Sequence, residues 1–175
     1  MKKIVAIGPE STGKSTLCQQ LSQHFQSTWV PEYAREYLVA HGMNYSYPDL
    51  ITIAKGQIKL EETITAEAQK TSIRHLFIDT DMYVMKVWCE YVFRKCHQYI
   101  IDQIVDRKYD LYLLCNIDLP WAYDPLREYP NEEPRKELYA IYKDILINQN
   151  TPWVEISGGS QQRLKTAIAS IKKLQ

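Results

Sequence analysis

The residues best suited to chemistry lie near the start of the sequence, in the segment GPESTGKS at positions 8–15. This segment fits the pattern GxxxxGKS, in which glycines let the backbone fold back so that successive N–H groups surround an anion. In such a loop the lysine, here Lys14, reaches the β- and γ-phosphates of ATP, and the hydroxyl of Ser15 joins the shell of a magnesium ion. The pattern therefore predicts a phosphate-binding loop (P-loop) for ATP and Mg²⁺.

The elements on either side of this loop are those that the motif requires. An apolar run over 3–7 predicts a strand that enters the loop, and Leu17, Leu21 and Phe25 recur at helical spacing after it. The N-terminus of that helix adds a partial positive charge. We therefore expect the nucleotide to be bound by Gly8, Glu10, Ser11, Thr12, Gly13, Lys14, Ser15 and Thr16.

A strand that ends in a carboxylate is expected beside the first strand. The run HLFID at 75–79 ends in Asp79, and Asp81 follows two residues later. Ligands bind beyond the carboxyl ends of the strands in an open α/β sheet, so Asp79 is expected to hold Mg²⁺ together with Ser15. Asp81 is a candidate for substrate binding or for the catalytic base, or it caps the next helix, and these roles are compatible.

The segment VPEYAREY at 30–37 supplies candidates for the acceptor side of the site. Glu32 follows an expected strand, and a carboxylate there could accept a hydroxyl proton or hydrogen-bond a ribose. Arg35 lies one helical turn later, where it could neutralise a phosphate, anchor Glu32 or form a surface ion pair. Tyr33 is grouped with them as an expected substrate-binding residue.

Four prolines between positions 120 and 134 indicate an extended lid segment at about 118–136. Arg127 and Arg135 are candidates to close over the transferring phosphoryl group, although each could also be a solvated surface charge. Trp121 in this segment and Tyr83 are the candidate aromatic contacts to a substrate.

A glycine turn follows the last expected strand. Ser157 and Gly158 in this turn either approach an adenine edge or form a plain helix-capping turn.

Five short apolar runs alternate with segments of helical period, which favours an α/β domain with a parallel sheet. The strands are expected at 3–7, 27–31, 75–79, 111–115 and 152–156. The helices are expected at 14–25, 48 to about 69, 82–97, 99–107, 135–148 and 161–174. The expected fold is that of a P-loop NTPase, a five-stranded parallel sheet flanked by helices, resembling nucleoside and nucleotide kinases. Residues 1–175 are expected to form a single domain.

The overall charge excludes several classes of partner. Lysine plus arginine and aspartate plus glutamate number 21 each, so we expect neither nucleic acid nor a membrane as partner. The apolar run near the start of the sequence is too short for the core of a signal peptide, so a cytoplasmic location is expected. The four cysteines are interpreted as reduced, mostly buried thiols, with a metal cluster at Cys89, Cys96 and His97 as the less favoured alternative. The sequence gives no oligomeric state.

Taken in order, these segments resemble the ribosylnicotinamide kinase domain of NadR-type proteins. The resemblance covers nearly the whole chain and is carried by GPESTGKSTL, PEYAREYL, FIDTD followed by KVW, PWAYDPLR and a terminal glycine turn with Arg163. It implies ATP-dependent phosphorylation of the ribose 5′-hydroxyl of nicotinamide riboside. By position it implies Glu32 and Arg35 at the acceptor, Asp79 and Asp81 at the metal and ribose, and Arg127 in the lid.

Two positions depart from the family pattern. Val84 and Met85 stand where the family often carries two threonines, and Pro125 stands where a glycine is usual. A kinase for another nucleoside or a vitamin therefore stays open. A third possibility is a regulatory ATPase that binds a protein partner, in which Glu32 would position a water molecule.

Overall fold

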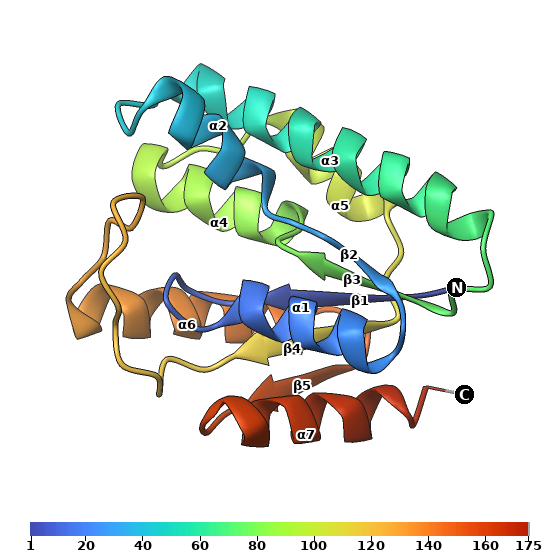
Figure 1. Cartoon of the computed structure of the whole chain (residues 1–175). Helices are drawn as coiled ribbons and strands as arrows, with labels where there is room; N and C mark the ends of the chain where they lie inside the picture. Colours follow the sequence, from blue (N-terminus) through green and yellow to red (C-terminus); the bar gives the residue numbers. More distant parts are fainter. Residues whose placement is uncertain (175) are drawn as a thin grey trace.

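The computed structural model describes residues 1–174, in which strands alternate with helices (Figure 1). The elements are β1 (Lys2–Ile7), α1 (Lys14–His24), β2 (Thr28–Val30), α2 (Tyr33–His41), α3 (Tyr47–Gln69), β3 (His75–Asp79), α4 (Met82–Phe93), α5 (Gln98–Asp106), β4 (Leu111–Cys115), α6 (Glu132–Ile147), β5 (Trp153–Ile156) and α7 (Ser160–Ile171). Each expected strand and helix is present within a few residues of its expected bounds.

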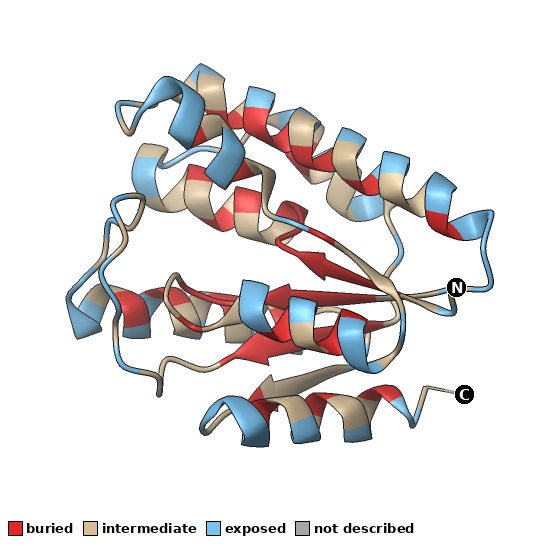
Figure 2. Cartoon of the chain, viewed as in Figure 1, coloured by how far each residue is buried: buried red, intermediate tan, exposed pale blue. Residues whose placement is uncertain are grey.

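The strands form one parallel sheet in the order β2-β3-β1-β4-β5. β1 lies in the centre, and its side chains alternate between the two faces. Ile4 and Ala6 pack with α1 and α7 on one face, whereas Val5 and Ile7 pack with α4 and α6 on the other. Because both faces are covered, the three inner strands β3, β1 and β4 are buried along most of their length (Figure 2). The predicted fold class is thus confirmed.

All strands point toward the same end of the sheet, where the loop after β1 and the loop before α6 also lie (Figure 1). β2 and β3 lie on one side of β1, and β4 and β5 lie on the other. The direction in which the chain adds strands to the sheet therefore reverses at β1. This reversal marks the position where α/β folds place their ligands.

Two helix boundaries differ from the expectation for local reasons. α4 ends at Phe93 rather than His97, because Arg94 adopts a left-handed conformation with φ of 57° and closes the helix. α6 begins at Glu132 rather than Arg135, because Pro134 is compatible with a first helical turn, where its missing N–H is not needed. No helix among residues 1–174 is long and apolar enough to cross a membrane.

A third buried cluster lies beyond the sheet and is formed by α2, α3, α4 and α5. Gly56 of α3 lies directly under the ring of Tyr33 at the start of α2, and a Cβ atom on Gly56 would lie 2.0 Å from Cε1 of that ring. The backbone N–H of Tyr33 also donates to Oε1 of Gln57 at 2.7 Å. The start of α2, and with it Glu32, is therefore seated on α3.

We expect Gly56→Ala to destabilise the protein. Glycine to alanine inside a helix normally stabilises by about 1 kcal/mol, but the added methyl group would displace the Tyr33 ring and cost about 1–3 kcal/mol net. Urea unfolding measures the change. Gly159→Ala, at the N-cap of α7, is the control for an added methyl group without a clash, because no described atom lies within 4 Å of a Cβ there. Stability at or above that of the unmodified chain would contradict this packing.

Candidate active site

The P-loop joins β1 to α1 as the motif requires. Gly8 has φ of 137°, and a Cβ atom there would lie 2.6 Å from the carbonyl oxygen of Cys115 on the neighbouring strand. The turn is closed from within, since the hydroxyl of Thr12 donates to the carbonyl oxygen of Pro9 at 2.7 Å. Lys14 Nζ lies against the same loop and donates to the carbonyl oxygens of Gly8 (3.0 Å) and Pro9 (2.8 Å).

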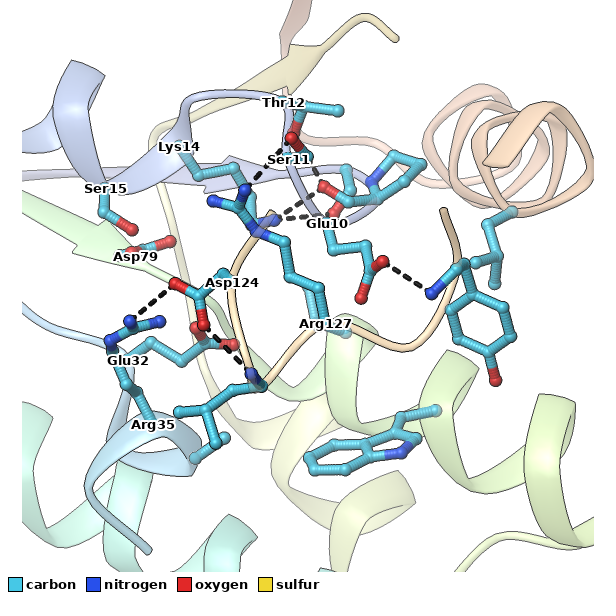
Figure 3. Close-up of a pocket in the computed structure, with 18 of the residues that line it drawn as sticks. Glu10, Ser11, Thr12, Lys14, Ser15, Glu32, Arg35, Asp79, Asp124 and Arg127 are labelled. Carbon is cyan, nitrogen blue, oxygen red and sulfur yellow. Dashed lines mark hydrogen bonds and ion pairs between the residues drawn. The ribbon is translucent and has the colours of Figure 1, made fainter. Parts of the chain in front are cut away.

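A cavity of about 480 Å³ opens over this loop. It is lined by Gly8, Pro9, Glu10, Ser11, Thr12, Gly13, Lys14, Ser15, Thr16, Trp29, Pro31, Glu32, Ala34, Arg35, Leu38, Asp79, Val84, Val87, Trp88, Tyr91, Asp124, Leu126, Arg127, Glu128, Tyr129, Leu138 and Tyr142. The volume suits a small organic ligand. The structure thus brings the expected nucleotide loop together with Glu32, Arg35, Asp79 and Arg127 (Figure 3).

Asp79 ends β3 beside the P-loop and near Ser15 (Figure 3). Its side chain is buried, and neither carboxylate oxygen accepts a hydrogen bond of normal geometry within the described chain. Burial and the nearby charge of Glu32 raise the pKa of Asp79 to about 7, although Lys14 and Ser15 act in the opposite direction. An unpartnered buried carboxylate beside a serine hydroxyl suits a hard cation such as Mg²⁺, which prefers oxygen ligands.

Asp81 is buried and caps α4. Its Oδ1 accepts the backbone N–H groups of Tyr83 (3.0 Å) and Val84 (3.3 Å), and its Oδ2 accepts the hydroxyl of Tyr112 at 2.8 Å. Burial raises the pKa of Asp81 to about 7, although these hydrogen bonds lower it. The capping role is confirmed. Neither Asp81 nor Tyr83 lines the cavity, so their contact with a substrate stays a prediction.

Thr80, between these two carboxylates, has φ of 77° and is buried. A positive φ is rare for a β-branched residue and is found mainly where function constrains the backbone.

On the acceptor side, Glu32 and Arg35 line the cavity. Arg35 forms an ion pair with Asp124 of the lid, with 2.6 Å between its terminal nitrogen and Oδ2. Arg35 is expected from the sequence to neutralise a phosphate, to anchor Glu32 or to form a surface ion pair. The structure shows an ion pair, and its partner is Asp124 of the lid rather than Glu32. Tyr33 does not line the cavity, because its ring lies over Gly56.

The lid connects β4 to α6 and contains no helix or strand over residues 116–131, so the expected segment 118–136 extends into α6. Arg127 lies over the P-loop and donates to the hydroxyl of Ser11 at 3.2 Å (Figure 3). Arg135 does not line the cavity. It is buried in the first turn of α6, and its Nε and one terminal nitrogen have no partner within residues 1–174. Trp121 also lies outside the lining and donates to Glu10 at 3.4 Å.

The glycine turn after β5 does not line the cavity but is joined to the P-loop by Arg163. The Arg163 guanidinium donates to the carbonyl oxygens of Thr12 (3.0 Å) and Gly158 (2.7 Å) and pairs with Asp118. Ser157 accepts a hydrogen bond from Asn116 at 3.1 Å. The adenine contact expected for Ser157 and Gly158 stays a prediction.

Sequence reasoning missed the aromatic wall of the cavity, formed by Trp88 and Tyr91 of α4 and Tyr129 of the lid. Trp88 and Tyr91 were visible as part of an apolar stripe at helical spacing, which is the usual mark of a core-facing helix. Glu128, also on the cavity wall, carried no signal in the sequence.

No group of three or more His, Cys, Asp or Glu side chains within residues 1–174 is arranged to hold a metal ion. The cysteines are free thiols, and the expected burial of most of them is confirmed for Cys18, Cys89 and Cys115.

Known proteins are similar to this chain over most of its length. The family model described as "AAA domain" matches residues 3–163. The "Trifunctional NAD biosynthesis/regulator protein NadR" of Escherichia coli (strain K12) is 28% identical over 160 residues, which are 89% of this chain and 38% of that protein. The chain thus spans less than half of the length of this relative.

Solved structures show the same fold. A NadR protein in complex with NR matches 99% of this chain and 49% of that chain, with a TM-score of 0.78 at 22% identity. A deoxyadenosine kinase from M. mycoides with bound dATP covers 99% of this chain and 100% of its own, with a TM-score of 0.67 at 11% identity. The chain therefore belongs to the AAA domain family and has the P-loop fold of nucleoside and nucleotide kinases.

Proposed function

We propose that this protein is an ATP- and Mg²⁺-dependent small-molecule kinase that phosphorylates nicotinamide riboside to nicotinamide mononucleotide. The similarity to NadR proteins, one of them solved with NR, supports a kinase of this class. The observation that carries the proposal is the cavity itself, in which the P-loop is continuous with a pocket that combines aromatic rings with carboxylates.

The aromatic part of this pocket is held in place by its own contacts. The rings of Tyr91 and Tyr129 meet edge to face, with 5.5 Å between their centroids. The indole N–H of Trp88 donates to the hydroxyl of Tyr45 at 2.9 Å, which fixes the orientation of the indole ring. Flat rings of this kind bind a planar ring by stacking, and they bind a cation through their negative faces.

The carboxylates favour a positively charged ligand. Glu128 accepts the hydroxyl of Tyr45 at 2.9 and 3.0 Å, and it has no cationic partner within the described chain. Glu32 likewise forms no ion pair with a described residue, whereas Asp124 is already paired with Arg35. Nicotinamide riboside carries a flat pyridinium ring on a ribose, which matches two unpaired carboxylates beside aromatic faces.

Catalysis in this proposal rests on positioning and electrostatics. Lys14 binds the β- and γ-phosphates, and Arg127 offsets charge on the transferring group. Glu32 orients the ribose hydroxyl and accepts its proton. Glu32 is favoured over Asp81 as the base because Glu32 lines the cavity, whereas both Asp81 oxygens already accept hydrogen bonds.

Asp79 and Ser15 would hold the magnesium ion, since both line the cavity and the Asp79 oxygens have no other partner within residues 1–174. The ion would neutralise phosphate charge when it is bound.

The first test is ATP consumption by the purified protein with Mg²⁺, with and without nicotinamide riboside, and identification of the product by mass. We expect nicotinamide mononucleotide, and Lys14→Ala should reduce its formation by about a thousand-fold or more while the fold is retained. Faster phosphate transfer to a neutral nucleoside or a vitamin would mean that this compound, and not nicotinamide riboside, is the acceptor. ATP hydrolysis that no acceptor changes would favour a regulatory ATPase.

A second test concerns the acceptor pocket. Glu128→Gln removes one negative charge and keeps the shape, so kcat/KM for nicotinamide riboside should fall about three- to ten-fold. A neutral nucleoside such as uridine, if it is accepted at all, should be much less affected. Glu133→Gln, an exposed substitution on α6, is the charge-matched control. Equal losses for charged and neutral acceptors would contradict recognition of a cation.

A third test uses the pKa of Asp79. A carboxyl group whose pKa is raised on folding stabilises the fold most below pH 4, and this contribution is lost as the pH rises through about 7. Asp79→Asn cannot ionise, so in EDTA its stability relative to the unmodified chain should be about 1–3 kcal/mol higher at pH 8 than at pH 4. Urea unfolding at both pH values measures this difference. The cost of burying the amide is the same at both pH values, so it drops out of the comparison. Asp102→Asn, at an exposed position of α5, is the control, and equal effects at both pH values would contradict the burial of an uncompensated charge.

A further inference from the structure

Glu10 occupies a position of the P-loop motif at which any residue satisfies the pattern, yet its carboxylate binds the lid at three points. Oε1 accepts the backbone N–H of Tyr129 at 2.7 Å and the indole N–H of Trp121 at 3.4 Å. Oε2 accepts the backbone N–H of Glu128 at 2.9 Å. The two oxygens therefore bind the lid both near its start, at Trp121, and near its end, at Glu128 and Tyr129. Figure 3 shows this carboxylate turned toward the lid main chain.

These contacts adjoin the residue that the lid brings to the phosphate loop. Arg127 directly precedes the two amides that Glu10 holds, and its guanidinium donates to the hydroxyl of Ser11 and to the carbonyl oxygen of Ala122. The backbone N–H of Ala122 donates to the same hydroxyl at 3.0 Å. Glu10 and Ser11 thus form one continuous seat for the lid on the P-loop.

The charge of Glu10 also faces the second arginine of this region. Burial lowers the pKa of the Arg135 guanidinium, the charges of Glu10 and Glu132 act in the opposite direction, and the charge of Arg127 lowers it further. With two of its nitrogens unpartnered within residues 1–174, the Arg135 guanidinium has few groups to compensate its burial. The negative charges of Glu10 and Glu132 therefore partly compensate the burial of this guanidinium group.

We propose that Glu10 is a positioning residue that fixes the lid on the P-loop and thereby places Arg127 for phosphoryl transfer. The role requires two acceptor oxygens that face two different N–H groups. A glutamine at this position offers only one oxygen, and its amide nitrogen would oppose a backbone N–H donor. The inference rests on the proposed kinase activity for its catalytic part, but not for the lid contact itself.

The contact is tested by hydrogen exchange at the amides of Glu128 and Tyr129 in the protein alone. Glu10→Gln should accelerate exchange at both amides by about ten-fold or more, since both lose a charged acceptor. Glu133→Gln removes the same charge at an exposed site and should leave exchange unchanged. Unchanged exchange in Glu10→Gln would overturn the inference. Equal thermal unfolding of the two variants controls for a general loss of stability.

The catalytic part is tested by turnover. Glu10→Gln should lower kcat by about ten- to a hundred-fold and change the Kd for ATP less than about three-fold, because Lys14 and the loop amides remain. Adding Arg127→Ala to Glu10→Gln should cost little more than Arg127→Ala alone, since both act through one group. Faster exchange with unchanged kcat, or fully additive losses, would overturn the positioning role. If the unmodified protein phosphorylates no acceptor, the proposed function fails, while the exchange measurement and the rate of ATP hydrolysis still decide this inference.

Discussion

The register between β1 and β3 is the constraint on which the nucleotide end of the molecule depends. Ala6 pairs with Asp79, and the backbone N–H of Thr80 donates to the carbonyl oxygen of Ala6 at 3.3 Å. The P-loop begins two residues after Ala6, so this pairing sets the carboxylate beside the loop. A slip of one residue would turn Asp79 to the opposite face of the sheet, because the side chains of a strand alternate. The alternating apolar contacts of β1 with the helices on both faces prevent such a slip.

The candidate site at this end of the sheet contains buried charged groups that lower the stability of the fold. Within residues 1–174, Asp79 is buried with neither oxygen partnered, and the buried Arg135 guanidinium has two nitrogens without a partner. Groups of this kind are costly in a folded protein unless a ligand or a counter-charge completes them. The remainder of the sheet supplies the compensation, because its strands are apolar along most of their length and covered on both faces. The polar demands are confined to the carboxyl ends of the strands.

Much of this arrangement could be predicted from local patterns. The P-loop, the strand ending in Asp79 and the parallel sheet follow from short motifs and apolar runs, which depend on residues near one another in the sequence. The aromatic wall could not be separated from the core, because Trp88 and Tyr91 share one apolar stripe with Val87. Which part of that stripe faces a cavity depends on where the lid lies, and the lid is held by contacts over more than a hundred residues of separation. The early end of α4 at Arg94 was missed for a different reason, since a left-handed arginine has no signature in the sequence.

Arg163 has a consequence for how the protein matures during synthesis. Its guanidinium is the partner of the Thr12 carbonyl oxygen, 151 residues earlier in the chain, and it also holds Asn116 and Gly158. The P-loop leaves the ribosome before residue 163, so it gains this partner only after that residue has followed. β1 likewise waits for both of its neighbours, since β3 and β4 are made later. In the nascent chain the P-loop therefore stays incompletely braced until residue 163 has been made. Nucleotide that binds the P-loop would then stabilise a chain that includes residue 163 more than any earlier intermediate.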